Sequence, residues 1–291
     1  MNESPTGEAG FAARLAGELA ASRHLCAGID PHAALLDEWG LENDPAGAER
    51  MGREVVAAAA GVAACVKPQI AFFERFGSAG LAALERVLAD AREAGLLVIA
   101  DVKRGDIGTS FAAYADAWLA PGSPLESDAM TVVAYQGFGS LEGALSHVRQ
   151  HGKGLFVLAA TSNPEAREVQ RAVREDGRTV AQAMVEDAQA FNRALEQVGP
   201  VGPVGVVLGA TLDLADFGID TAPAGVEEIP ALPVLAPGFG AQGARIEHAR
   251  AIFGSLGGAL LANESRGILS GGAQGLAERI RTRAEALAEA L

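Results

Sequence analysis

The chain has 291 residues, of which 49% are hydrophobic, and its formal net charge is −14 at pH 7. This length allows one large α/β domain or two ordinary ones, with enough apolar residues for a sizeable core. Nucleic-acid binding is not expected, because no basic stripe interleaved with aromatic residues occurs in the sequence. In so acidic a chain, an anionic ligand has to be attracted by a local group of cations.

Signals for export and membrane insertion are missing from the sequence. The first ten residues are polar and acidic, unlike a signal peptide. The longest apolar run, residues 55–66, is Ala-rich and shorter than the ~18 residues that span a bilayer. Cys26 and Cys65 have apolar neighbours and no CxxC spacing, so we expect buried thiols rather than a metal or redox pair. These features predict a soluble protein of the reducing cytoplasm.

Short apolar runs alternate with helical patterns in chain order. An extra N-terminal helix is expected at residues 8–22 and a closing helix at residues 271–291. Ala, Leu, Glu and Arg recur at helical spacing in stretches such as 78–94, 179–197 and 242–253. Continuous apolar runs, typical of parallel strands covered on both faces, predict strands at 24–30, 62–68, 96–103, 128–134, 154–160, 203–209, 232–236 and 257–262.

Eight strands, each followed by a helix, predict an α/β protein of the (β/α)₈ barrel class. No Pro/Ser-rich linker divides the chain, so we expect a single domain over residues 1–291. A doubly wound open sheet has the same alternation and is the alternative. Its phosphate loop normally lies near the start of the domain, whereas the Gly-rich loop of this chain lies near the end.

In a barrel of this class, functional residues lie where the strands end at the C-terminal face. Asp30 ends the first predicted strand, Lys67 the second, and Asp101 and Lys103 the third. Side chains two residues apart on a strand share a face, so Asp101 and Lys103 are expected to point together into the barrel mouth.

Asp106 follows on the next loop, which gives a set of two lysines and two aspartates. An ion-pair network that merely closes the barrel is the alternative interpretation. Because buried charges are costly, a catalytic role is the better explanation for four of them.

A phosphate site is predicted at the loops after strands 7 and 8. "GFGAQG" (238–243) satisfies GxGxxG, a weak signal by itself, but it lies where barrels of this class bind phosphate. Gly238 and Gly240 would let backbone N–H groups approach phosphate oxygens, and Arg266 could bind two oxygens at once. Ordinary tight turns and a surface ion pair of Arg266 are the alternatives.

These segments resemble the orotidine 5′-phosphate decarboxylase family, in the longer form found in many bacteria. "DVKRGDIGTS" (101–110) resembles the DxKxxDI signature of that family. Other matches occur in order across nearly the whole chain: "AGIDPH" (27–32), "VKPQIAFFE" (66–74), "AATSNP" (159–164), "LGAT" (208–211), "PGFGAQG" (237–243) and "ESRGIL" (264–269). The resemblance implies conversion of orotidine 5′-phosphate to uridine 5′-phosphate by a homodimeric barrel, without metal or organic cofactor.

The resemblance also implies roles for particular residues. Lys67, Asp101, Lys103 and Asp106 match the catalytic tetrad, in which Asp106 would act in the site of the partner subunit. Residues that match substrate-binding positions are Asp30 for the ribose, Ile107 and Ser110 for the neighbouring site, Ser140 for the pyrimidine, and Gln242 and Arg266 for the phosphate.

The chain departs from the family pattern near Ser140. Val133 and Ala134 stand where the family more often has Asn-Pro, Gly139 stands in place of Asp, and Ser110 replaces a usual Thr. Two other functions remain open. One is a metal-dependent sugar-phosphate decarboxylase or lyase on a related barrel that shares DxKxxD, and the other is a non-catalytic nucleotide-binding barrel.

Overall fold

The computed structural model describes residues 9–196, 199–222 and 230–291. Within these residues, parallel strands close into a barrel in the order of the sequence, as the (β/α)₈ prediction requires. The strands are β1 (Leu25–Ile29), β2 (Cys65–Pro68), β3 (Leu97–Arg104), β4 (Ala129–Val132), β5 (Gly154–Ala160), β6 (Val204–Leu208), β7 (Val234–Pro237) and β8 (Leu260–Glu264).

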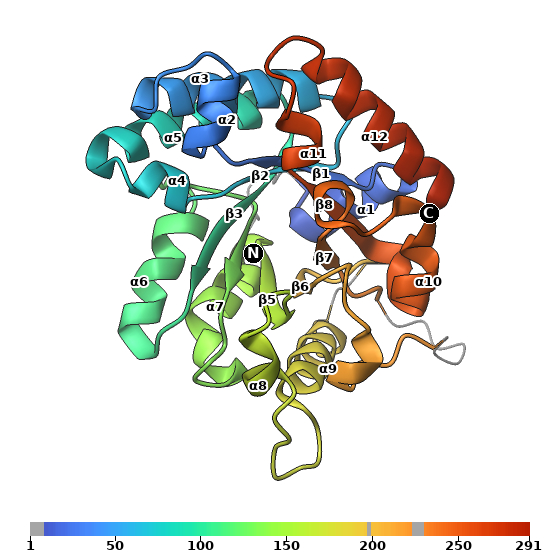
Figure 1. Cartoon of the computed structure of the whole chain (residues 1–291). Helices are drawn as coiled ribbons and strands as arrows, with labels where there is room; N and C mark the ends of the chain where they lie inside the picture. Colours follow the sequence, from blue (N-terminus) through green and yellow to red (C-terminus); the bar gives the residue numbers. More distant parts are fainter. Residues whose placement is uncertain (1–8, 197–198, 223–229) are drawn as a thin grey trace.

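Helices surround the barrel on its outside (Figure 1). The α-helices are α1 (Phe11–Ala20), α2 (Ala33–Glu38), α3 (Pro45–Ala59), α4 (Ala71–Glu74), α5 (Gly77–Glu93), α6 (Gly108–Leu119), α7 (Glu142–His151), α8 (Ala166–Gln170), α9 (Val180–Arg193), α10 (Ala249–Phe253), α11 (Arg266–Leu269) and α12 (Leu276–Ala290). Short 3₁₀ helices are η1 (Phe138–Leu141), η2 (Leu214–Phe217), η3 (Gly240–Gln242), η4 (Ile246–His248) and η5 (Gly254–Ala259). No helix of the described ranges is long and apolar enough to cross a membrane.

The strands are apolar on both faces because each face packs against a separate core. Alternate residues such as Leu97 and Ile99 of β3 fill the barrel interior, while Val98 and Ala100 pack outward under the helices. This alternation explains the continuous apolar runs of the sequence. Cys26 and Cys65, partners on adjacent strands, lie in the interior core as free buried thiols, as predicted.

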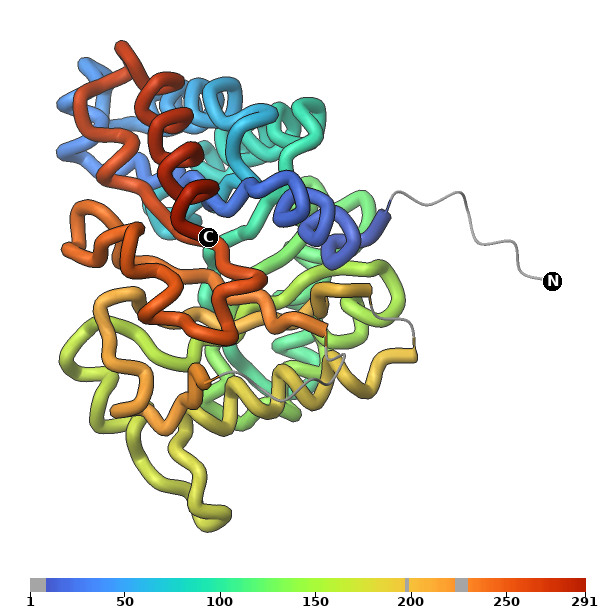
Figure 2. The backbone as a smooth tube through the Cα atoms, turned by 90° about the vertical axis from the view of Figure 1, so that its right-hand side faces the viewer, coloured from blue at the N-terminus to red at the C-terminus, as the bar shows by residue number. Residues whose placement is uncertain are grey.

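The expected N-terminal helix is present as α1, which lies at one end of the barrel (Figure 2). The Phe11 ring packs edge-on against Phe156 with 5.9 Å between ring centroids. Arg14 pairs with Asp128, just before β4, at 2.5 Å. Because both contacts lie at the N-terminal ends of strands, α1 covers the end of the barrel opposite to the predicted site.

Two predicted elements near the C-terminus were wrong in detail. The expected helix over 242–253 is replaced by the end of η3, by η4 and by the short α10. Gly243, in what would be the first turn, has a backbone conformation that interrupts a helix (φ +103°). The strand expected at 257–262 starts later, at Leu260, and continues to Glu264, because residues 254–259 form η5. The later register makes Glu264 the last residue of β8.

The strand–helix alternation is also less regular than predicted after β6 and β7. The described residues between β6 and β7 form one helical element, the 3₁₀ helix η2. Between β7 and β8 the chain forms η3, η4, the short α10 and η5. The expected helix at 179–197 is α9, whose first turn is capped by the Thr179 side chain, and part of that stretch lies outside the described residues.

Candidate active site

Lys67, Asp101 and Lys103 form a chain of ion pairs at the mouth of the barrel, here called the charged cluster. Lys67 Nζ lies 2.6 Å from Asp101 Oδ2, and Lys103 Nζ lies 2.5 Å from Asp101 Oδ1. The alternation of β2 and β3 places Lys67 and Asp101 there, because each follows by two residues a side chain, Cys65 or Ile99, that fills the barrel interior. The structure brings these three side chains together, although Lys103 reaches Asp101 from an irregular part of β3 rather than by the predicted regular alternation.

Burial differs along the charged cluster. The Lys67 and Asp101 side chains are only 6% and 8% exposed, whereas the Lys103 side chain is 43% exposed. Lys103 therefore presents its ammonium group to the outside of the cluster. It is the member best placed to meet a ligand.

The two buried groups are both ionised, because each stabilises the charge of the other. Burial alone would lower the pKa of Lys67, but the negative charges of Asp101 and Asp30 raise it above the usual range. Burial alone would raise the pKa of Asp101, but the two lysine ammonium groups hold it below the usual range. The site thus keeps a fixed carboxylate between two cations.

The backbone of Lys103 is in the left-handed region, with φ +46°, which is rare for a residue with a side chain. Such strained positions cost roughly 1–3 kcal/mol and cluster at functional sites. The pairing of β3 with β4 shifts register between Ala100 and Arg104, so the strand bulges where Lys103 lies. In this backbone conformation Lys103 departs from the regular strand, and its ammonium group contacts Asp101.

Two polar partners of the charged cluster were not predicted. The Lys103 ammonium also donates to Gln69 Oε1 at 3.3 Å. The Thr131 hydroxyl donates to Asp101 Oδ1 at 2.8 Å and accepts the backbone N–H of Lys103 at 2.9 Å. Gln69 follows Lys67 closely in the sequence, and Thr131 is a polar residue within an apolar strand run; either could have served as a signal.

A pocket of about 230 Å³ lies beside the charged cluster, between the ends of β1, β7 and β8. Its lining brings together four residues predicted from the sequence: Asp30, Gly238, Gln242 and Arg266. His32, Phe72, Phe239 and Asn263 are further lining residues that the sequence did not assign to a site. The negative charge of Asp30, which lines the pocket, contributes to the raised pKa of Lys67 in the charged cluster.

Asp30 has a carboxylate oxygen, Oδ1, that is buried and has no hydrogen-bond partner within the described chain. Buried acceptors in native proteins are normally paired, since an unpaired one costs about 1–3 kcal/mol. A ligand hydroxyl in the pocket would supply the missing donor. His32 also lines the pocket. Its Nδ1 atom accepts the Leu35 N–H at 3.4 Å, which makes His32 the N-cap residue of α2.

The loop after β7 is a tight turn that needs its glycines. Gly238 has φ +120°, and its carbonyl oxygen accepts the Ala244 N–H at 3.1 Å. A Cβ on Gly240 would lie 2.9 Å from Glu264 Oε2, and one on Gly267 equally close to the same oxygen. The loops after β7 and β8 therefore both pack on the Glu264 carboxylate.

Glu264 is buried and pairs with Arg283 of α12, whose Nη2 lies 2.5 Å from Oε1. The Nε group of Arg283 donates to both carboxylate oxygens, at 2.9 and 3.0 Å. Through Gly267, which lines the pocket, and Gly240, the pair is in contact with the loops on either side of it. The pair could not be predicted from the sequence, because Glu264 lies two residues beyond the predicted end of the last strand and Arg283 is distant along the chain.

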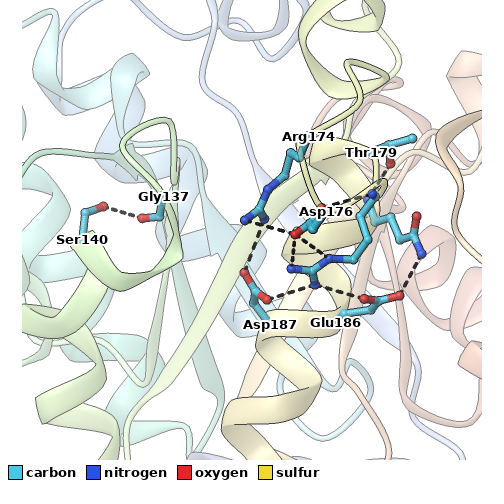
Figure 3. A network of polar contacts seen from close by, with 9 residues as sticks. Gly137, Ser140, Arg174, Asp176, Thr179, Glu186 and Asp187 are labelled. Atoms are coloured by element: carbon cyan, nitrogen blue, oxygen red, sulfur yellow. Dashed lines mark hydrogen bonds and ion pairs between the residues drawn. The ribbon is translucent and has the colours of Figure 1, made fainter.

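The structure does not bring the remaining predicted residues into the charged cluster or the pocket lining of the described chain. They are Gly240, which lies against Glu264, and Asp106, Ile107, Ser110 and Ser140. The Asp106 carboxylate accepts the backbone N–H of Ile107 at 2.8 Å, and Ile107 is 61% exposed. Ser110 is exposed on the first turn of α6. The Ser140 hydroxyl donates to the Gly137 carbonyl oxygen at 2.7 Å, as Figure 3 shows.

A separate ion-pair network appears on the other side of Figure 3. Arg178 pairs with Asp176, Glu186 and Asp187 at 2.8, 3.0 and 3.3 Å, joining the loop before α9 to that helix. These groups are substantially exposed, and such pairs contribute about 0–1 kcal/mol each. The network stabilises a surface loop. Among the described residues, no three His, Cys, Asp or Glu side chains are grouped so that they could hold a metal ion.

Comparison with known proteins places this geometry in a family. A family model described as orotidine 5′-phosphate decarboxylase / HUMPS family matches residues 23–273. The orotidine 5′-phosphate decarboxylase of Streptomyces coelicolor is 50% identical over 265 residues, covering 90% of each chain. That of a Nocardioides species is 51% identical over 263 residues, covering 89% of this chain and 91% of the relative.

Solved structures show the same likeness in three dimensions. A crystal structure from Streptomyces avermitilis, assigned to the same enzyme, superposes with a TM-score of 0.89 at 46% identity, covering 100% of this chain and 99% of the other. The structure of Leishmania donovani OMP decarboxylase gives a TM-score of 0.72 at 29% identity, covering 95% and 98%. The chain belongs to the orotidine 5′-phosphate decarboxylase / HUMPS family.

Proposed function

We propose that this protein decarboxylates orotidine 5′-phosphate to uridine 5′-phosphate in pyrimidine nucleotide synthesis. The observation that carries the proposal is the charged cluster, in which Asp101 lies between two lysine ammonium groups beside a pocket with Arg266 and Gln242. Relatives at about half identity over nine-tenths of the chain carry the name of this decarboxylase, which supports the same conclusion.

Asp101 would face the carboxylate of the substrate. Two like charges 4 Å apart repel by ~4 kcal/mol at an effective dielectric constant near 20. The repulsion disappears when the carbon–carbon bond breaks and neutral carbon dioxide leaves. Because the lysines keep Asp101 ionised, the repelling charge is present before the reaction begins.

Lys103 would stabilise the electron pair that the broken bond leaves on ring carbon 6. An ammonium group at that point interacts most strongly with charge that develops only near the transition state, and such interactions accelerate a reaction. Lys103 then donates its proton to carbon 6, which completes uridine 5′-phosphate, and regains a proton from solvent. Lys67, which contacts the other oxygen of Asp101, would hold the carboxylate in place.

The pocket would hold the rest of the nucleotide. The unpartnered Oδ1 atom of Asp30 would accept a ribose hydroxyl, and the loop with Gly238 and Gly240 would surround the phosphate with backbone N–H groups. Arg266, exposed at the start of α11, would bind two phosphate oxygens. Gln242 would bridge from the phosphate towards the base, and Ser140 would contact the pyrimidine.

A homodimer would complete the site. Asp106 lies on the loop between β3 and α6, away from the charged cluster of its own chain, so we propose that it acts in the site of the partner, with Ile107 and Ser110. The apolar side chains exposed near this rim support an interface: Ile107 is 61% exposed and Tyr135 is 81% exposed. We further propose a single domain and a cytoplasmic setting, in agreement with the buried free thiols.

The alternatives differ in what they require. A metal-dependent sugar-phosphate lyase on this barrel would use the acids as metal ligands, but both Asp101 oxygens already accept ammonium groups. A non-catalytic nucleotide-binding barrel would give no turnover. The contacts of Asp101 favour the metal-free decarboxylase.

The test is the loss of orotidine 5′-phosphate absorbance in the presence of excess chelator. We expect turnover by the wild type and a near-complete loss in the Lys103→Ala variant, while the surface variant Arg281→Met retains full activity. Activity that chelator abolishes and magnesium restores would favour the metal-dependent lyase. Absence of turnover in a folded wild-type protein would refute the proposed decarboxylase.

A further inference from the structure

We infer that Thr131 is a positioning residue, which fixes Asp101 and Lys103 in their reactive arrangement through a single hydroxyl group. The inference rests on the proposed function, since it assigns a role within the same site. Thr131 lies in β4, is 1% exposed, and would not touch the substrate. Both hydrogen bonds of its hydroxyl group are with residues of the charged cluster.

The hydroxyl of Thr131 uses both of its hydrogen-bonding roles at once. It accepts the backbone N–H of Lys103 at 2.9 Å and donates to Asp101 Oδ1 at 2.8 Å. The same Asp101 oxygen accepts the Lys103 ammonium at 2.5 Å. The two ends of Lys103 are therefore joined in one ring of contacts: main chain to hydroxyl, hydroxyl to carboxylate, and carboxylate to ammonium.

The strained backbone of Lys103 explains why such a contact is needed. With φ +46° and a shifted register between β3 and β4, the Lys103 N–H has no regular strand partner. Thr131 Oγ1 takes the place of that partner. Threonine is also stiff about its first side-chain torsion, so the hydroxyl is held in one direction.

If residue 131 only filled space in the core, valine would be preferred to threonine at this position. Thr131 lies on the inward face of β4, two residues after the apolar Ala129 of the interior core. Valine has nearly the same shape and would suit an apolar core without burying a hydroxyl. The presence of the hydroxyl is explained by Asp101 and Lys103, not by packing.

The experiment compares Thr131→Val with Thr131→Ser. In Thr131→Val we expect kcat to fall by about tenfold to a hundredfold, the scale reported for displaced catalytic groups, with KM changed by less than about threefold. Thr131→Ser keeps the hydroxyl and should recover most of the lost kcat. Val132→Ala, which removes volume from the outward face of the same strand, is the matched control for instability and should keep the wild-type kcat.

A second measurement does not depend on turnover. We expect amide hydrogen exchange of Lys103 to be at least about tenfold faster in Thr131→Val than in the wild type, because the acceptor is lost, while exchange of Val98 is unchanged. Wild-type kcat in Thr131→Val, a serine variant as impaired as the valine variant, or unchanged exchange at Lys103 would each overturn the inference. Failure of the wild type to decarboxylate would instead refute the proposed function and leave the exchange test intact.

Discussion

At the scale of single residues, Asp101 is the carboxylate that holds the two lysines of the site together. Its carboxylate is 8% exposed and is shared by Lys67, which is 6% exposed, and Lys103, which is 43% exposed. A buried ion pair seldom stabilises a fold more than apolar residues of the same volume would, but removing one partner of it is strongly destabilising. The cluster is therefore a poor device for stability alone, which agrees with a catalytic role.

The shifted pKa values predict how stability depends on pH. Folding lowers the pKa of Asp101. Its ionised carboxylate therefore adds to the free energy of unfolding above the unfolded pKa of about 3.9, and this stabilisation is lost as the pH falls from there through the folded pKa. Folding raises the pKa of Lys67. Its ammonium group therefore adds to the free energy of unfolding below the unfolded pKa of about 10.4, and this stabilisation is lost as the pH rises through the folded pKa. Between these limits the cluster should contribute a constant stability.

Replacing Asp101 by Asn should therefore change both the size and the pH dependence of stability. At pH 7 we expect the free energy of unfolding to fall by about 3–5 kcal/mol, because Lys67 remains buried without its main partner. The variant should become more stable as the pH rises from 7 to 10, where buried Lys67 can lose its charge. Chemical denaturation across pH measures this, and the exposed Asp37→Asn variant serves as control. An Asp101→Asn protein with wild-type stability and a flat profile would show that the pair is not coupled to folding.

At the scale of elements, the pocket depends on how β8 and α12 meet. Glu264 ends β8, and Arg283 of α12 approaches its carboxylate through Nε and Nη2. Gly240 and Gly267, from the loops after β7 and β8, both lie against the same carboxylate. The contact between a strand end and a distant helix thus sets the position of the proposed phosphate loops.

Breaking this contact should weaken substrate binding. We expect Arg283→Met to raise KM for orotidine 5′-phosphate by about tenfold, corresponding to ~1.4 kcal/mol, and to change kcat less. Stability should fall by about 2–3 kcal/mol, less than for a fully buried pair because Arg283 is 30% exposed. Steady-state kinetics and thermal denaturation test both effects against Arg281→Met, which breaks an exposed pair on the same helix. Equal KM values in the two variants would mean that Glu264 does not support the phosphate loops.

At the scale of the whole molecule, the proposed site needs two chains. Within the described protomer Asp106 contacts Ile107 rather than the charged cluster, and the rim beside it exposes Ile107 and Tyr135. Burial of these exposed apolar side chains against a second copy of the chain would be favourable, and a symmetric dimer would bury them on both copies. If Asp106 acts in the site of the partner, as proposed, a single chain lacks one residue of its own catalytic set.

Mixed dimers test this arrangement directly. Lys103→Ala and Asp106→Asn chains should each be nearly inactive alone. Mixed under conditions that exchange subunits, they should regain activity, because a hybrid dimer contains one site with both native residues. Lys103→Ala mixed with a Lys103→Ala/Asp106→Asn double variant is the control and should stay inactive. If the hybrid dimers form but show no decarboxylase activity, Asp106 acts in the site of its own subunit.

The sequence by itself determined the barrel and the residues at its mouth. Apolar runs of strand length alternating with helical patterns require strands covered on both faces, and a period of two carries Lys67 and Asp101 inward from the core residues before them. Asp30, Gly238 and Arg266 were predictable for a similar reason, since each follows a strand whose end lies on one rim, whereas Gln242 was implied by the family resemblance.

Only the tertiary structure decided the contacts between strands and the exact course of the loops. The bond of Thr131 to Lys103, the shifted start of β8 and the pairing of Glu264 with Arg283 depend on register, and register is set by packing across the whole barrel. The helix expected over 242–253 is not formed as one element, because the positive φ of Gly243 outweighs the helix propensity of the residues that follow it. Local sequence patterns fix which side of a strand a residue faces, whereas its partners depend on neighbours that are distant along the chain.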